Sequence, residues 1–147
     1  MCTMCAAISK RDGFFIAELP HHVWRLAEDQ TWPGWSMLIH KKHVTELFEM
    51  SPAERAAAME EVSEAARILK NTFGATKMNI ELLGNQEPHV HWHIIPRRTD
   101  DPAWNRPIWT FAHAPVRLSP REHDAVVARI RRKIPAPSAA ASSPPQA

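Results

Sequence analysis

Three short apolar runs near the start of the chain alternate with turn signals. The runs are centred on Phe15, Trp24 and Leu38, and clusters of proline, glycine or acidic residues separate them. Runs of this length that are rich in aromatic and β-branched residues are typical of strands. The pattern predicts three strands between residues 13 and 39.

A long helix is predicted next. Ser51 precedes a proline at the first helical position, and Glu54 follows three residues after Ser51. This combination is a capping signal for a helix start. An alanine-rich segment continues to about Phe73, and Gly74 ends it.

Two further strands are expected after this helix, over residues 77–83 and 89–95, with a Gly-Asn turn between them. The second segment places His89, His91 and His93 two residues apart. Because successive side chains of a strand point to opposite faces, the three imidazoles are expected on one face. The apolar residues between them, Val90, Trp92 and Ile94, are then expected to face the core.

The last part of the chain predicts a second helix and a tail. The Ser-Pro-Arg-Glu sequence at 119–122 repeats the capping signal and predicts a helix over 123–133. Proline, alanine and serine dominate from Pro135 onward, which leaves too little apolar surface to offset the entropy of ordering. We expect one domain at 1–133 and a disordered tail at 134–147.

Composition and charge exclude several classes of protein. Lysine and arginine number 18 and aspartate and glutamate 16, so the net charge of +2 gives no reason to expect nucleic acid or a membrane surface as a partner. No apolar run approaches the ~20 residues that span a bilayer, and the N-terminus lacks the pattern of a secretory signal. The sequence predicts a cytoplasmic protein.

Several segments carry a resemblance to a known family. The histidines form an H-x-H-x-H pattern followed by two apolar residues, Lys41-Lys42-His43 follows the third strand, and the ranges 84–88 and 101–104 flank the motif. The chain resembles the histidine triad (HIT) family of nucleotide hydrolases and transferases, in its bacterial branch labelled diadenosine tetraphosphate hydrolase-like. The resemblance implies an α+β fold with a five-stranded antiparallel sheet, one main helix and a homodimer that joins two sheets. The pattern adds a C-terminal helix.

The resemblance implies a covalent mechanism. Family members cleave the α-phosphorus bond of a nucleoside phosphate through a nucleotidyl-histidine intermediate, which assigns His91 as nucleophile and His93 as the contact that stabilises the α-phosphate. Imidazole is a good nucleophile at neutral pH, and neighbouring imidazoles disfavour each other's protonation. We expect a hydrolase or transferase acting on a small-molecule nucleotide, either a dinucleoside polyphosphate or a nucleoside phosphoramidate.

Polar residues upstream of the motif are candidates for binding the substrate. By position, the resemblance points to Asn79 on the preceding strand and to Asn85 and Gln86 in the loop. It assigns Asp29 to the ribose hydroxyls. Family members often carry serine or threonine at the leaving-group contact, whereas this loop offers amides and Glu87.

A second constellation suggests a metal. Several relatives hold structural zinc with an N-terminal C-x-x-C pair, a histidine after the third strand and the first histidine of the motif, which correspond here to Cys2, Cys5, His43 and His89. Two thiolates and two imidazoles form a closed tetrahedral zinc site. A reduced, unliganded cysteine pair is the alternative. No organic cofactor is expected.

Two other functions stay open. A zinc-hydroxide hydrolase would use the histidines as metal ligands, but side chains at i, i+2 and i+4 of one strand diverge too far to share one ion. A nucleotide-binding regulatory module with little turnover would use the same pocket as the enzyme.

Tryptophans and arginines near the motif have less specific roles. Trp35 falls on a predicted strand and is expected in the core, whereas Trp109 lies in the loop after the motif, where a dimer contact or a substrate edge suits it better. Arg97 and Arg98 could neutralise a distal phosphate, although arginines after a strand are more often solvated charges.

Overall fold

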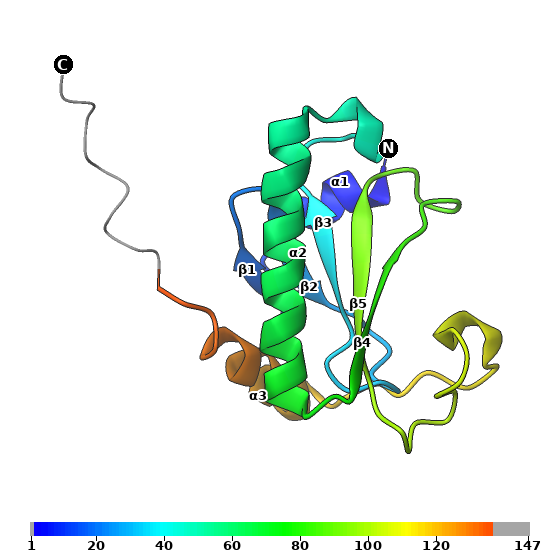
Figure 1. The fold of residues 1–147 in the computed structure, drawn as a ribbon. Helices are drawn as coiled ribbons and strands as arrows, with labels where there is room; N and C mark the ends of the chain where they lie inside the picture. The colour runs from blue at the N-terminus through cyan, green and yellow to red at the C-terminus, as the bar shows by residue number, and fades with distance from the viewer. Residues whose placement is uncertain (1, 137–147) are drawn as a thin grey trace.

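The centre of the fold is a five-stranded sheet in the order β1-β2-β3-β5-β4, with every neighbouring pair antiparallel. The computed structural model describes residues 2–136 of the 147-residue chain. Figure 1 shows α2 lying along one face of this sheet. The elements in chain order are α1 (Thr3–Ile8), β1 (Phe15–Glu18), β2 (His22–Leu26), β3 (Ser36–His40), α2 (Pro52–Phe73), β4 (Lys77–Leu82), β5 (His91–Arg97) and α3 (Pro120–Arg131), with 3-10 turns at Leu47–Glu49 and Ile108–Thr110.

The predicted long helix is confirmed, and its ends are explained by local chemistry. Glu54 N–H donates to the Ser51 hydroxyl, and the Glu54 carboxylate accepts from Ser51 N–H, which satisfies two amides at the helix start. At the other end Gly74 has φ +62°, a left-handed conformation that glycine adopts without steric cost. The same capping pair at Ser119 and Glu122 starts α3.

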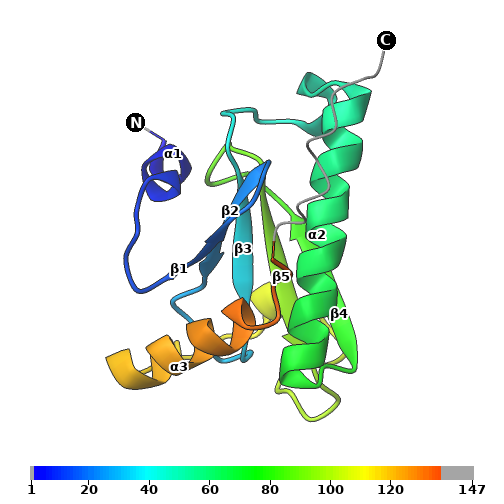
Figure 2. The same cartoon turned by 90° about the vertical axis from the view of Figure 1, so that its left-hand side faces the viewer.

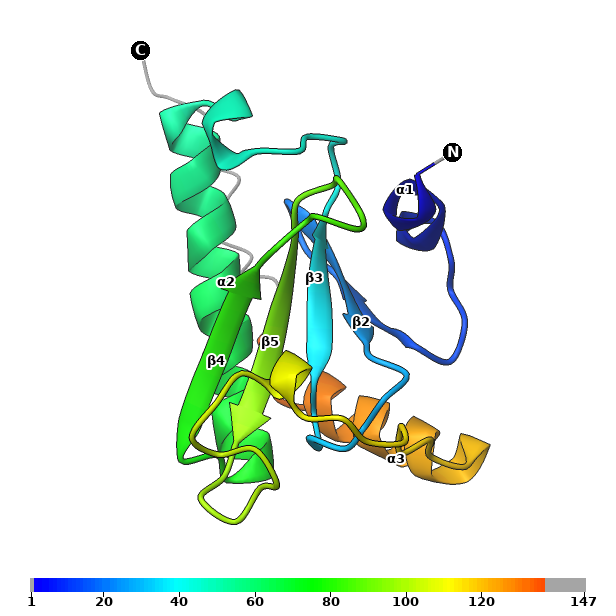
Figure 3. The ribbon, with the colours of Figure 1, turned by 90° about the vertical axis from the view of Figure 1, so that its right-hand side faces the viewer.

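The sheet separates two environments. Figures 2 and 3 show it standing between α2 on one side and α1 on the other. The face toward α2 carries the main apolar core, which includes Trp24, Leu38, Trp92 and Ile94. Val90 also belongs to this core, so the predicted orientation of the apolar residues in the motif is confirmed. The opposite face is therefore left for His91 and His93.

The expectation that all three histidines lie on one strand is wrong. Strand β5 begins at His91, and the chain bends at His89, whose N–H donates to the carbonyl of Glu87 at 2.8 Å. Pro88, immediately before, has no N–H for a strand ladder. The side chain of His89 therefore does not follow the alternation of side chains along β5, and it points toward Cys2 and Cys5.

The two ends of the described chain differ from the sequence-based expectation or extend beyond it. The short helix α1 had no signal in the sequence pattern, and none of its residues is buried. Ile134 packs partly buried against the main core, whereas residues 137–147 of the expected disordered tail lie outside the described residues. No helix in the described part of the chain combines the length and apolarity needed to cross a membrane.

Candidate active site and metal centre

A cavity of about 420 Å³ opens on the sheet face opposite α2. Strands β3 and β5 form its floor, and the loop between β4 and β5 forms one wall. Figure 3 shows this loop and α1 at the same end of the sheet. The lining residues are Met4, Met37, Leu83, Gly84, Asn85, Gln86, Glu87, His91, His93 and Trp109.

His91 is held in the tautomer that a nucleophile requires. Its ring is buried, and Nδ1 lies 2.6 Å from the carbonyl oxygen of His89. A carbonyl only accepts hydrogen bonds, so Nδ1 carries the proton and Nε2 keeps its lone pair. The backbone of His89 therefore orients the adjacent histidine of the motif.

His93 is held in the opposite tautomer. The indole N–H of Trp35 donates to His93 Nδ1 at 3.3 Å, and because an indole only donates, the proton of His93 sits on Nε2. Burial, followed by the charge of nearby His91, lowers the pKa of His93 from 6.5 to about 4. At neutral pH His93 is an uncharged ring with one N–H to offer a phosphate oxygen.

Two tryptophans surround His93, and the motif itself did not indicate them. The Trp35 ring centroid lies 5.9 Å from that of His93, and the Trp109 centroid lies 4.9 Å away. The indole N–H of Trp109 donates to the Glu81 carboxylate, which holds the ring at the cavity wall. Trp35 is buried as expected for the core, yet its polar atom belongs to the site.

The loop before β5 brings two predicted residues into the cavity. Gly84 has φ +95°, a conformation unfavourable for a residue with a Cβ, and the chain turns there between β4 and the motif. Asn85 and Gln86 follow it and line the cavity with His91. Within residues 2–136 neither amide side chain has a hydrogen-bond partner, so both are available to a ligand.

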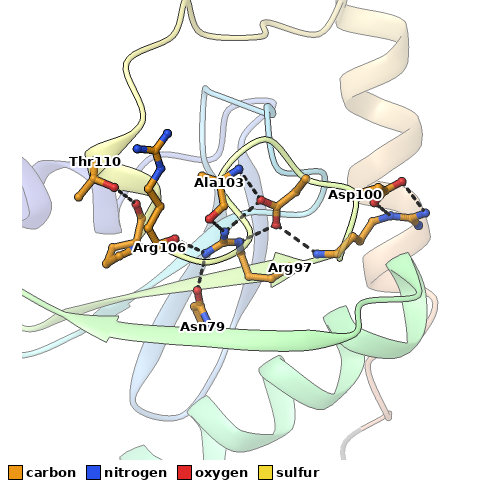
Figure 4. A network of polar contacts seen from close by, with 9 residues as sticks. Asn79, Arg97, Asp100, Ala103, Arg106 and Thr110 are labelled. Carbon is orange, nitrogen blue, oxygen red and sulfur yellow. Dashed lines mark hydrogen bonds and ion pairs between the residues drawn. The ribbon is translucent and has the colours of Figure 1, made fainter.

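Asn79 is not brought to the cavity. Figure 4 shows its side chain beside Arg97, whose Nη1 donates to Asn79 Oδ1 at 2.7 Å. Arg97 is almost fully buried, pairs with Asp101 at 2.7 Å and also donates to the carbonyls of Ala103 and Arg106. The expectation that Arg97 is a solvated charge or a phosphate ligand is wrong, because this network uses its donors to hold the loop after β5.

Asp29 lies beside a neighbouring hollow rather than in the histidine cavity. Its carboxylate accepts from the N–H and the hydroxyl of Thr31 at 2.9 and 2.7 Å, from Val116 N–H at 3.1 Å and from His113 Nε2 at 2.8 Å. These donors hold the pKa of Asp29 below its usual value against the effect of burial. The structure gives Asp29 a role in joining two loops.

The four predicted metal ligands are gathered in one cluster. One ligand atom from each of Cys2, Cys5, His43 and His89 lies within 4.8 Å of the others. His89 Nε2 lies 2.7 Å from the carbonyl oxygen of His40, so it carries the proton and leaves the Nδ1 lone pair directed at the cysteines. The donors suit a closed site with two sulfur and two nitrogen ligands, and the cluster could hold a metal ion.

The fold and these two centres define an α+β protein with a histidine-lined cavity beside a cysteine and histidine cluster. Residues 9–100 match the HIT domain family, and the chain belongs to that family. A histidine triad (HIT) protein from Sinorhizobium meliloti 1021 is 36% identical, with a TM-score of 0.77 over 84% of this chain and 91% of that chain.

Two other similar proteins carry more specific descriptions. The asymmetrical bis(5'-nucleosyl)-tetraphosphatase of Schizosaccharomyces pombe is 31% identical over 74 residues, which cover 47% of this chain and 41% of that protein, so the chain spans about two fifths of this relative. A Zn-bound histidine triad family protein from Mycobacterium smegmatis shares the fold at a TM-score of 0.67 and 21% identity, covering 90% of this chain and 91% of that one.

Proposed function

We propose that the protein is a nucleotide hydrolase or transferase that cleaves the α-phosphorus bond of a nucleoside phosphate derivative through a nucleotidyl-His91 intermediate. The observation that carries this proposal is the pair of opposite tautomers in one cavity. His91 offers a lone pair on Nε2, whereas His93 offers a proton on Nε2. One ring is thereby suited to attack and the other to stabilise the oxygens of the attacked group.

The reaction has two displacements at one phosphorus. The lone pair of His91 Nε2 forms a P–N bond as the bond to the leaving group breaks and the leaving atom takes its electron pair. Water then attacks the same phosphorus, the P–N electron pair returns to His91, and a nucleoside monophosphate is released. One proton of the water stays on the new P–OH group, and the other goes to the departed leaving group or to solvent. In a transferase, another acceptor takes the place of the water.

The cavity residues divide the work of binding. His91 Nδ1–H remains on the His89 carbonyl, which stabilises the positive ring of the intermediate. His93 donates to an oxygen of the α-phosphate, and the free amides of Asn85 and Gln86 supply further donors from the loop. Asn79 and Asp29 stay outside this proposal as direct substrate contacts, because neither lines the histidine cavity. Asn79 Oδ1 also accepts from Arg97, and the Asp29 carboxylate accepts from Thr31, His113 and Val116.

A dinucleoside polyphosphate is the proposed substrate, with a nucleoside phosphoramidate as the alternative. The similarity to the asymmetrical tetraphosphatase supports the first choice. The loop also lacks a hydroxyl donor, and a polyphosphate leaving group needs no proton at neutral pH, whereas an amine does. A zinc-hydroxide mechanism has less support, since His89 turns toward the cysteines and away from His91.

A substrate panel tests the proposed function. Wild type, His91→Ala and His21→Ala are compared on dinucleoside polyphosphates and phosphoramidates, with His21 as a histidine outside the cavity. We expect turnover by wild type and His21→Ala and a loss of at least about 1,000-fold in His91→Ala. Normal nucleotide binding without hydrolysis by wild type would identify a regulatory module instead.

We also propose that Cys2, Cys5, His43 and His89 bind a structural zinc ion. The donor set and the fixed tautomer of His89 support zinc, and the Mycobacterium smegmatis relative is described as Zn-bound. When bound, the ion would tie the N-terminal helix to the segment that precedes the catalytic strand. His91 and His93 need no metal for their proposed roles.

A homodimer and a cytoplasmic location complete the proposal. Strand β4 forms one edge of the sheet, and Ile80 and Leu83 at this edge are 43% and 54% exposed. An unpaired strand edge with apolar side chains suits pairing with a second copy. The cytoplasmic location stays a prediction from the sequence.

A further inference from the structure

The carboxylate of Glu87 differs from the other partly buried carboxylates of the protein. Each of the others between residues 2 and 136 accepts a hydrogen bond from a protein donor; they are Asp29, Glu54, Glu61, Glu64, Glu81 and Asp101. The Glu87 carboxylate has no hydrogen bond or ion pair within the same residues. A carboxylate that has lost part of its water and gained no protein partner is available to a ligand.

The loop before β5 fixes the position of Glu87. Pro88 follows it, and a residue before proline is restricted to extended backbone. The Glu87 carbonyl accepts from His89 N–H at 2.8 Å, and the His89 carbonyl accepts from His91 Nδ1 at 2.6 Å. A short run of bonded backbone therefore ties Glu87 to the proposed nucleophile, and both residues line the histidine cavity.

The histidine cavity offers a substrate no positively charged side chain. Of the described residues that line it, none is lysine or arginine, and Glu87 is the one acidic residue. His93 is uncharged at neutral pH, because burial lowers its pKa to about 4. N–H donors can thus stabilise the oxygens of one phosphate, but no lining side chain neutralises a row of phosphates.

We propose that Glu87 binds positive charge carried by the leaving half of the substrate, an inference that rests on the proposed function. The nucleoside monophosphate half brings no such charge, because its base and ribose are uncharged and its phosphate is negative. A dinucleoside polyphosphate brings Mg²⁺, which proteins hold through one or two carboxylates together with substrate phosphates. A phosphoramidate brings an ammonium group if its amine carries one.

Glu87 would then select leaving halves by their charge. A polyphosphate without a bound cation meets only repulsion from the carboxylate, whereas the Mg²⁺ complex gains an attractive contact. An amine with an ammonium group gains a charge-assisted hydrogen bond that an uncharged amine of the same length lacks.

Two substitutions change the charge at this position. Glu87→Gln keeps the size of the side chain and removes the charge, and Glu87→Lys reverses it. The partly exposed position limits the effect of both on folding. Glu60→Gln, at an exposed position of α2 outside the cavity, is the matched control.

Calorimetry in a His91→Ala background measures binding of diadenosine tetraphosphate without turnover. Magnesium is removed from solutions with a resin, because a dissolved chelator would also act on the cysteine and histidine cluster. We expect Mg²⁺ to tighten binding about 10-fold with Glu87 present and less than about twofold with Glu87→Gln. Glu87→Lys should bind the magnesium-free ligand more tightly than the parent. AMP, which has no leaving half, should respond less than about twofold to Mg²⁺ in every protein.

A matched pair of substrates tests the ammonium source. The adenosine phosphoramidates of ethylenediamine and propylamine have leaving amines of the same length, one ending in an ammonium group and the other in a methyl group. We expect wild type and Glu60→Gln to favour the ethylenediamine compound about 10-fold in kcat/KM. Glu87→Gln should reduce this preference below about twofold, and Glu87→Lys should reverse it.

The two arms identify the source of the charge. An effect of Glu87 on only the magnesium dependence or only the amine preference supports the proposal and names its source. Equal changes for all ligands, or no change in either arm, would overturn it. If wild type hydrolyses none of the substrates, the proposed function fails, and the calorimetry still decides whether Glu87 binds a cation.

Discussion

At the level of single residues, two hydrogen bonds give His91 and His93, on the same strand, opposite tautomers. The His89 carbonyl fixes the proton of His91, and the Trp35 indole fixes that of His93. The family motif predicted His91 and His93 as the reacting pair, and both line one cavity. It could not predict their tautomers, because Trp35 lies 58 residues from His93 and meets it only in the folded sheet.

Trp35→Phe tests the tautomer assigned to His93. The variant keeps a large aromatic ring and removes the N–H that donates to His93 Nδ1. Loss of one hydrogen bond predicts a fall in kcat of roughly 5- to 10-fold with KM little changed. Nitrogen-15 chemical shifts of His93 should show its proton spread over both ring atoms. A variant with wild-type kcat would contradict the assigned role.

The free energy of unfolding should decrease as the pH is lowered, because His93 is buried as a neutral ring. The unfolded chain takes up this proton as the pH falls through about 6.5, whereas the folded protein resists it until the pH nears 4, so the loss develops between these values and is absent at higher pH. Between about pH 7.5 and about pH 5, the shift predicts a loss of about 2 kcal/mol in the free energy of unfolding. Urea denaturation of wild type and His93→Gln measures it. Identical losses in both proteins would contradict the prediction.

At the level of helices and strands, the elements whose ends are set by neighbouring residues in the sequence could be predicted. Those set by contacts between distant residues could not. The Ser51 cap and Gly74 end of α2 depend on neighbours in sequence, and both predictions are confirmed. The bend at His89 depends on contacts with His40 and the cysteines, which the strand pattern does not contain. The helix α1 buries no residue, so it has no amphipathic signal to detect.

Cys5→Ser tests the link between α1 and the metal cluster. Because α1 has no buried residues, side chains at Cys2 and Cys5 are expected to hold it in place. Zinc in protein purified without a histidine tag should fall from about one ion per chain to near zero. Trypsin should then cleave faster after Lys10 and Arg11. Ser9→Ala, in the turn that ends the same helix, is the control and should keep both its zinc and its resistance.

At the level of the whole molecule, the two faces of the sheet have different surroundings. One face packs against α2 and carries the main core, and the other carries the histidine cavity. Asn85 and Gln86 line the cavity, as their position just before the motif led us to expect. Asn79 and Asp29 do not line it, because Arg97 and His113, from other segments of the chain, bond to Asn79 Oδ1 and Asp29 Oδ2.

Ile80→Glu tests the proposed dimer. Two negative charges on facing β4 edges would repel each other, and the partly exposed position limits the effect on folding. Sedimentation should give twice the chain mass for wild type and the chain mass for the variant. Phe48→Glu, on an exposed 3-10 turn, should remain dimeric. A monomeric wild type would show that β4 is a free edge.

The proposed mechanism requires that His91 becomes covalently linked to the nucleotide. Wild type, His91→Ala and His93→Gln are mixed with a dinucleoside polyphosphate labelled at its α-phosphorus, quenched in base, where phosphohistidine bonds survive, and digested for peptide mapping. We expect label on the peptide that contains His91 in wild type and none in His91→Ala. Rapid hydrolysis with no labelled peptide, together with loss of turnover on chelation of zinc, would contradict it.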